Sequence, residues 1–260
     1  MILRRLTQNV KDQNWFAVVL DFIIVVIGVV IGLQVSNWNE ARAEMARASE
    51  YSARLMDDLD FEYDYVISLI DYTEATLEAG NEAYLGLTGQ VEMDDKTIMI
   101  HAFRASQYNW YERRRATFDE MVSAGSFRLI ENGQLRDAAF GMFSTPLFDI
   151  MREEGGTADY RTYYRETIEP SVVETLRQAC GDLQVDTGNR FITLITLDYE
   201  CDPDITADDL ANGVAALRTH PDILDALRLR TAQRAGRVSD MQNTLDTIRL
   251  KDLLGREDAA

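Results

Sequence analysis

Two histidines, His101 and His220, are the only imidazoles in this 260-residue chain, and they limit the chemistry it can support. Neither lies in an H-E-x-x-H pattern or follows a glutamate by three residues, the spacings of helical zinc and di-iron sites. No G-x-S-x-G, Walker or G-x-G-x-x-G pattern occurs either. His220 precedes Pro221, where helix capping explains it, and His101 is expected to be structural. We therefore expect no catalytic residues, no cofactor and no enzymatic activity.

Carboxylates at the spacing of a calcium-binding loop occur in the segment 202–209. An EF-hand loop needs glycine at its sixth position and glutamate at its twelfth. Here these positions hold Ala207 and Gly213. We expect a polar loop followed by a helix cap, and no metal site.

Three consecutive arginines form the one basic cluster of an otherwise acidic region: Arg113, Arg114 and Arg115, beside Trp110. Guanidinium groups bind carboxylate and phosphate through paired hydrogen bonds. Trp110 and the three arginines are therefore candidates for binding an anionic envelope polymer, a lipid headgroup or an acidic protein. The alternative is that the arginines form internal salt bridges with the excess of carboxylates.

The two cysteines of the chain are Cys180 and Cys201. A bond between them would close a loop of about 20 residues and stabilise the fold by about 3 kcal/mol. Such bonds persist in oxidising compartments. We expect the disulfide, with two separate reduced thiols as the alternative.

The compartment in which the cysteines lie can be predicted from the apolar segment Trp15–Val35, which contains one charged residue, Asp21. About 20 apolar residues cross a hydrocarbon core of roughly 30 Å. A buried core helix rarely runs so long without a polar face, and a secretory signal has a shorter apolar region. We expect a retained single-pass transmembrane helix.

The flanking charges predict the orientation of that helix. Arg4, Arg5 and Lys11 precede it, and basic residues next to a span stay in the cytoplasm. Residues 1–14 are therefore expected to be cytoplasmic and residues 36–260 to form an extracytoplasmic domain. The net charge of −18 falls entirely on residues 41–260, because residues 1–40 hold three charges of each sign. An acidic domain does not fit nucleic acid as a partner.

Two features inside the span predict helix association. Gly28 and Gly32 form a G-x-x-x-G pattern, which lets two helix backbones approach closely. Asp21 is costly near lipid, and such residues are functional candidates. The alternatives without helix association are that glycine is simply common in transmembrane helices and that the Asp21 carboxylate reaches the headgroups. We expect a homo-oligomer or a membrane protein partner in addition to the bilayer.

The remaining periodicity predicts an all-α bundle with a small irregular or β insert near 181–201. The membrane helix is expected to continue without a break through residues 37–86, with Gly80, Gly86 and Gly89 ending it. Further expected elements are a helix at 97–108, a helical hairpin at 117–143 that begins at a Thr117 cap, and a break at Gly155-Gly156. A helix at 158–179 kinked at Pro170, a strand at 191–197 and a helix at 206–217 capped by Thr206 are expected to follow. In the final helix, after Pro221, Arg234 interrupts the apolar stripe and is expected to pair with a carboxylate.

The segments 21–28, 34–40 and 117–137 carry a resemblance. They read DFIIVVIG, QVSNWNE and TFDEMVSAG…LI…LRD, and are similar to an uncharacterised bacterial family of single-pass membrane proteins. The similarity covers roughly residues 14–40 and 115–143. It implies a protein of the bacterial cell envelope, placed in the inner (cytoplasmic) membrane with a periplasmic domain, and it supplies no activity.

These observations favour a non-enzymatic, membrane-anchored interaction or scaffold protein. Two alternatives remain. One is an extracytoplasmic sensor, which would have to signal through a membrane partner because about 14 cytoplasmic residues cannot form an output domain. The other is a hydrolase-type enzyme with an unrecognised carboxylate site.

Overall fold

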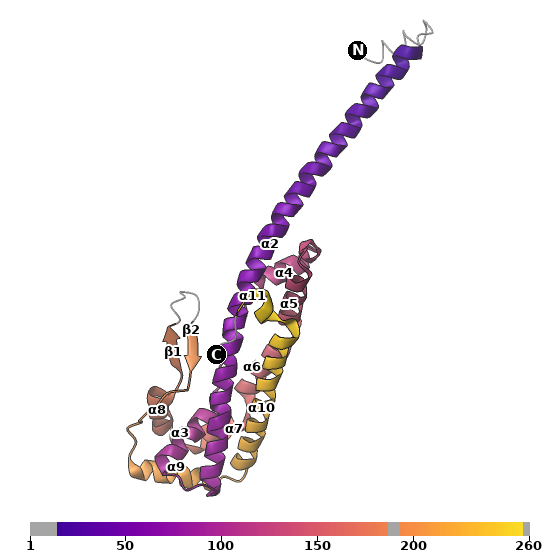
Figure 1. Ribbon diagram of the computed structural model, residues 1–260. Helices are drawn as coiled ribbons and strands as arrows, with labels where there is room; N and C mark the ends of the chain where they lie inside the picture. Colours follow the sequence, from indigo (N-terminus) through magenta and orange to yellow (C-terminus); the bar gives the residue numbers. More distant parts are fainter. Residues whose placement is uncertain (1–14, 187–192, 257–260) are drawn as a thin grey trace.

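The dominant element of the computed structural model is one helix, α2 (Trp15–Thr88), of 74 residues. The structure describes residues 15–186 and 193–256. At 1.5 Å per residue, α2 is about 110 Å long. Its first half extends away from the other elements and its second half runs through the bundle (Figure 1). The predicted continuation of the apolar helix into the domain is therefore confirmed.

Of the three glycines expected to end this helix, only Gly89 does so, in a left-handed conformation at φ 71°. Gly80 and Gly86 lie inside α2, so that part of the prediction is wrong. A Cβ atom at Gly80 would lie 2.7 Å from the Thr231 hydroxyl, and one at Gly86 would lie 2.8 Å from the Ile98 side chain. Both glycines let neighbouring helices approach α2 closely.

One long helix, α10, several short helices and one hairpin surround the second half of α2 (Figure 1). In chain order they are α3 (Asp95–Ala105), α4 (Ala116–Ser123), the 3-10 turn η1 (Phe127–Leu129), α5 (Gly133–Ser144), α6 (Leu147–Thr157), α7 (Asp159–Thr167), α8 (Pro170–Cys180), β1 (Leu183–Asp186), β2 (Thr193–Thr196), α9 (Ala207–Thr219), α10 (Ile223–Ile248) and α11 (Leu250–Leu254). The predicted helical class with a small β insert is confirmed.

Side-chain caps define several helix starts. Asp94 accepts a hydrogen bond from the Thr97 amide at 3.0 Å, and Asn132 accepts one from the Leu135 amide at 3.1 Å. The predicted Thr206 cap is also present, because its hydroxyl accepts from the Asp209 amide at 3.2 Å. Each cap satisfies an amide that has no acceptor inside its helix.

The structure shows that three of the predicted helix boundaries are wrong. The predicted Thr117 cap is absent, because α4 begins at Ala116 and Thr117 is buried inside it. Helix α6 runs through Gly155 and Gly156, and the missing Cβ at Gly155 lets the Tyr108 ring pack against the helix. Pro170 starts a separate helix, α8, at its first position instead of kinking a longer one. Proline is tolerated there because that position needs no amide hydrogen.

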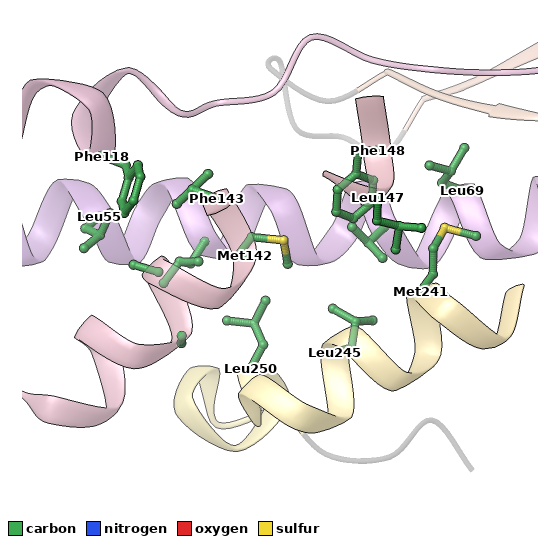
Figure 2. Close-up of a cluster of buried hydrophobic side chains, with 14 of the residues drawn as sticks. Leu55, Leu69, Phe118, Met142, Phe143, Leu147, Phe148, Met241, Leu245 and Leu250 are labelled. Carbon is green, nitrogen blue, oxygen red and sulfur yellow. The ribbon is translucent and has the colours of Figure 1, made fainter. Parts of the chain in front are cut away.

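Two hydrophobic clusters follow one another along α2. The proximal core joins the first buried turns of α2 to α4, α5, α6, α10 and α11. Its side chains converge from these elements in Figure 2, which labels Leu55, Leu69, Phe118, Met142, Phe143, Leu147, Phe148, Met241, Leu245 and Leu250. The distal core joins Ala83 and Leu87 to α3, α7, α8, α9 and the start of α10.

A polar layer lies between the two cores along α2 and α10. It contains Tyr72 of α2, Arg161 of α7, Asp182, and Arg230 and Arg234 of α10. The Tyr72 hydroxyl donates to the Asp182 carboxylate at 2.7 Å. Arg230 and Arg234 are 4% and 5% exposed. Arg234 was expected to pair with a carboxylate, but its hydrogen bond goes to the Gln107 main-chain carbonyl at 3.0 Å.

The insert is an antiparallel hairpin in which Leu183 of β1 pairs with Thr196 of β2. The predicted strand at 191–197 matches β2 over 193–196, and residues 191–192 lie outside the described part of the chain. β1 was not predicted as a strand, because Val185 is its single β-branched residue, whereas β2 contains three. A disulfide joins Cys180 at the end of α8 to Cys201 beyond β2, with Cα atoms 5.3 Å apart.

Candidate functional site

The arginine cluster predicted from the sequence centres on a buried carboxylate, Glu62 of α2, whose side chain is fully buried. The Arg113 guanidinium donates to Glu62 Oε2 at 2.9 and 3.0 Å. The Tyr111 hydroxyl donates to the same oxygen at 2.9 Å, and the Arg114 amide donates to Oε1 at 2.8 Å. Burial, then the Glu62 charge, raises the pKa of Tyr111 above its usual range. Glu62 thus holds the whole 111–114 segment against α2.

Arg113 also links this segment to α5 and α6. Its guanidinium donates to the Met142 carbonyl at 2.9 Å and lies 4.3 Å from the Phe148 ring centre. Arg115 pairs with Asp119 of α4 at 2.9 Å, and the Arg114 guanidinium lies 3.7 Å from the Phe61 ring centre. Arg113 and Arg115 therefore form internal salt bridges, which was the alternative interpretation of the cluster.

A surface cleft lies beside this network, and Trp110 is in its wall together with Arg113 and Arg115. Asn109, Glu112 and Asp149 add polar groups to it, and Leu69 and Phe148 add apolar ones. Trp110 is 39% exposed. The structure thus brings three of the four predicted binding residues to one cleft.

Arg152 of α6 is a cleft residue that sequence reasoning missed. Its guanidinium lies 4.0 Å from the Trp110 ring centre, so the two side chains stack as a cation–π pair. Arg152 follows Trp110 by 42 residues in the chain. No short-range pattern connects residues so far apart.

The first half of α2 is the second candidate surface. Among the described residues, α2 is the one helix that is long and apolar enough to cross a membrane. The most apolar window of α2 lies in this first half and is not buried at all. It is therefore not a core helix of this bundle, although a signal sequence near the N-terminus would pass the same test of length and composition.

The predicted helix-association residues share one face of α2. Asp21 precedes Gly28 by seven residues, which is close to two helical turns, and Gly32 follows by about one turn. No side chain or distant backbone lies within 4 Å of a Cβ added at Gly28 or Gly32. This face is therefore open within the chain.

The other helices meet α2 well beyond this face along its axis. Leu55, the first fully buried residue of α2, follows Gly28 by 27 residues, which corresponds to about 40 Å at 1.5 Å per residue. Within the bundle, the buried residues of α2 lie on several sides of the helix, among them Leu55, Tyr72 and Gly86. The face of Asp21 and Gly28 is therefore separated from the bundle by distance along α2.

The two histidines have structural surroundings. His220 Nδ1 accepts a hydrogen bond from the Asp222 amide at 3.2 Å, but Asp222 is itself the cap position of α10, and this helix start has no side-chain cap. The expected capping role of His220 is therefore wrong. His101 lies in α3, where burial lowers the pKa of its imidazole, and its Nδ1 has no hydrogen-bond partner in the described structure. In the part of the chain that the structure describes, no hydrogen bond or salt bridge joins either histidine to a carboxylate that would orient it as a catalytic base.

The loop 202–209, which has the spacing of a calcium-binding loop, is held by an ion pair and by a hydrogen bond at its cap. Lys96 pairs with Asp202 at 2.6 Å, and Thr206 donates to the Asp209 carboxylate at 2.7 Å. Within the residues that the structure describes, no three histidine, cysteine or acidic side chains gather as metal ligands would.

Comparisons of the chain with protein-family models, curated proteins and solved structures give no match. The resemblance of the anchor and the 115–143 hairpin to an uncharacterised bacterial family therefore stays a prediction.

Proposed function

We propose that this chain is a non-enzymatic interaction or scaffold protein, anchored in the inner membrane of a bacterial envelope with its domain in the periplasm. The observation that carries the proposal is α2, a single helix that contains the apolar window and also contributes to both cores of the bundle. An element of this kind fixes a domain to an anchor without a flexible linker.

The proposed contact surface is the face of α2 that holds Asp21, Gly28 and Gly32. Without a hydrophobic driving force between helices, membrane helices associate through small residues that permit close packing. Because the core of the bundle begins at Leu55, about 40 Å farther along α2, a helix docked within the apolar segment does not meet the domain. A second copy is the simplest occupant, since its α2 has the same orientation in the same membrane.

The stalk between residues 36 and 54 supports the same proposal. Trp38 and Met45 are 62% and 66% exposed, although both are large apolar side chains. From the membrane end at Val35 to the first fully buried residue, Leu55, the helix rises about 30 Å at 1.5 Å per residue. A helical partner along the stalk would bury these exposed apolar side chains and so stabilise it.

Co-purification of two differently tagged copies from the membrane, in mild detergent, tests the proposal. Gly28→Ile places a branched side chain on the proposed face, and Val30→Ile enlarges an apolar side chain by one methylene about 200° away around the helix. We expect wild type and Val30→Ile to retain the second copy or a membrane partner, and Gly28→Ile to lose it. Folding should be unaffected, because Gly28 has no neighbours within the chain.

Wild-type protein that retains neither a second copy nor another membrane protein would exclude the scaffold role. Equal retention by Gly28→Ile and wild type would move the contact to another surface. The intact mass of membrane-extracted protein distinguishes a retained anchor from a cleaved signal, and protease protection in spheroplasts reports on which side of the membrane the domain lies.

A further inference from the structure

The N-terminus of α7 opens into a small pocket between α6, α7 and α10. Its wall contains Ala158, Asp159 and Tyr160 at the start of α7, and Arg230 and Gln233 from α10. Ala158 is the cap residue of α7 and provides no side-chain hydrogen bond. The first amides of a helix have no acceptor inside it, and they carry the positive end of the helix dipole.

Arg230 adds a positive charge to the same pocket. The residue is 4% exposed, and its Nε has no hydrogen-bond partner in the described structure. Its two terminal nitrogens donate to main-chain carbonyls, those of Glu154 at 3.2 Å and Gln107 at 3.3 Å. Carbonyl groups satisfy these N–H donors but do not neutralise a buried cation.

Two further arginines lie near Arg230. Arg234 is 5% exposed and also has an unpartnered Nε, and Arg161 lies nearby in the polar layer. Burial, and next the charge of Arg234, lowers the pKa of Arg230. A buried cation without a counterion is costly, and a bound anion would reduce that cost.

Two carboxylates face the pocket, and neither forms a salt bridge with Arg230 in the described residues. Glu154 is engaged by Arg237, whose guanidinium donates to both carboxylate oxygens at 2.6 and 2.9 Å. Asp159 is exposed and lies in the first turn of α7. Arg230 makes no salt bridge within the part of the chain that the structure describes.

We propose that this pocket binds the oxyanion group of a small soluble ligand, a phosphate or a carboxylate. The free amides of α7 and the Arg230 side chain would contact its oxygens, and Thr157 and Gln233 complete the polar wall. Helix N-termini and arginine side chains are the two protein groups best suited to such oxygens.

The pocket is too far from the proposed anchor for a lipid headgroup to reach. Thr231, next to Arg230, contacts α2 at Gly80. Gly80 lies 45 residues beyond Val35, which corresponds to about 68 Å along the helix. The ligand must therefore come from solution.

Isothermal titration calorimetry of the full chain in detergent tests the proposal, with inorganic phosphate and acetate as probes in a chloride buffer. We expect saturable binding of at least one probe. Arg230→Gln should weaken it by about tenfold or more, because charge-assisted hydrogen bonds are lost. Arg228→Gln is the matched control, since Arg228 is on the same helix with its side chain 62% exposed. It should bind as wild type does.

Ala158→Asp provides a second variant that is expected to fold. Aspartate is a favoured cap residue, and its carboxylate would bond to the same amides and occupy the site. We expect the variant to be more stable than wild type and to bind the probe at least about tenfold more weakly. Absence of saturable binding by both probes, or wild-type binding by Ala158→Asp, would overturn the proposal.

Discussion

The buried pair between Glu62 and Arg113 is expected to control the stability of the proximal half of the bundle. Its two side chains are 0% and 10% exposed. Glu62→Gln keeps the shape of the side chain but removes its charge and leaves Arg113 without a carboxylate. It also places an amide NH2 group among four donor contacts from Tyr111, Arg113 and the Arg114 amide. The N–H group of the new amide then faces the O–H or N–H donors that bonded to the carboxylate.

The magnitude follows from burial. Removing one partner of a buried ion pair costs about 3–5 kcal/mol, because the other charge stays buried and unpaired. With a urea m-value of about 2–3 kcal/mol per M for a domain of this size, the unfolding midpoint should fall by about 1–2.5 M. Glu120→Gln removes the same charge from an exposed pair with Arg54, whose side chains are 49% and 42% exposed. It should cost about 0–1 kcal/mol.

Tryptophan fluorescence during urea unfolding of the full chain in detergent provides the assay. Trp110 lies beside the Glu62 network, whereas Trp15 and Trp38 are in the exposed first half of α2. The change in signal on unfolding of the bundle should therefore come mainly from Trp110. If Glu62→Gln and Glu120→Gln shift the midpoint equally, the network does not hold the 111–114 segment, and the reasoning from burial fails.

Three further predictions concern other parts of the bundle. Reduction of Cys180–Cys201, which are 21 residues apart, should lower the free energy of unfolding by about 3 kcal/mol in thiol-containing urea titrations, and a Cys180→Ser/Cys201→Ser variant should not respond to the thiol. Gly155→Ala should lower the free energy of unfolding by about 1–3 kcal/mol, because its methyl group overlaps the Tyr108 ring. Gly236→Ala, in open space within α10, should raise it by about 0.5–1 kcal/mol. Equal effects of the two substitutions in thermal unfolding would refute this contrast. The hydrogen bonds from Arg237 lower the pKa of Glu154 from its usual 4.5, so the stability it contributes is present above pH 4.5 and is lost as the pH falls through the lower folded-state value. Glu154→Gln should therefore show a smaller loss of stability than wild type between pH 5 and pH 3, and parallel curves would count against the pair.

Elements with continuous local signals could be predicted from the sequence. Helix α2 combines an apolar run with a regular stripe through Leu55, Leu59, Val66 and Ile70, and no proline interrupts it. The Thr206 cap has the same local character, because the hydroxyl and the amide it accepts from are three residues apart. Such signals depend only on residues close together in the chain.

Contacts between distant segments could not be predicted in this way. Glu62 is one of many acidic residues on α2, and its burial depends on Arg113, 51 residues later. Arg234 was recognised as an interruption of an apolar stripe, yet its acceptor is a carbonyl 127 residues away. A carbonyl at the end of a helix has no side-chain signature, so the sequence pointed to a carboxylate instead.

The position of α2 also decides how a contact at the membrane can affect the domain. Its residues are buried in the proximal core at Leu55 and Leu59 and in the distal core at Ala83 and Leu87. A rotation of α2 about its axis must therefore either carry both cores with it or break the packing of both. Packed cores resist such repacking, so a partner that fixes the face of Gly28 also fixes the direction in which the bundle and the Trp110 cleft point.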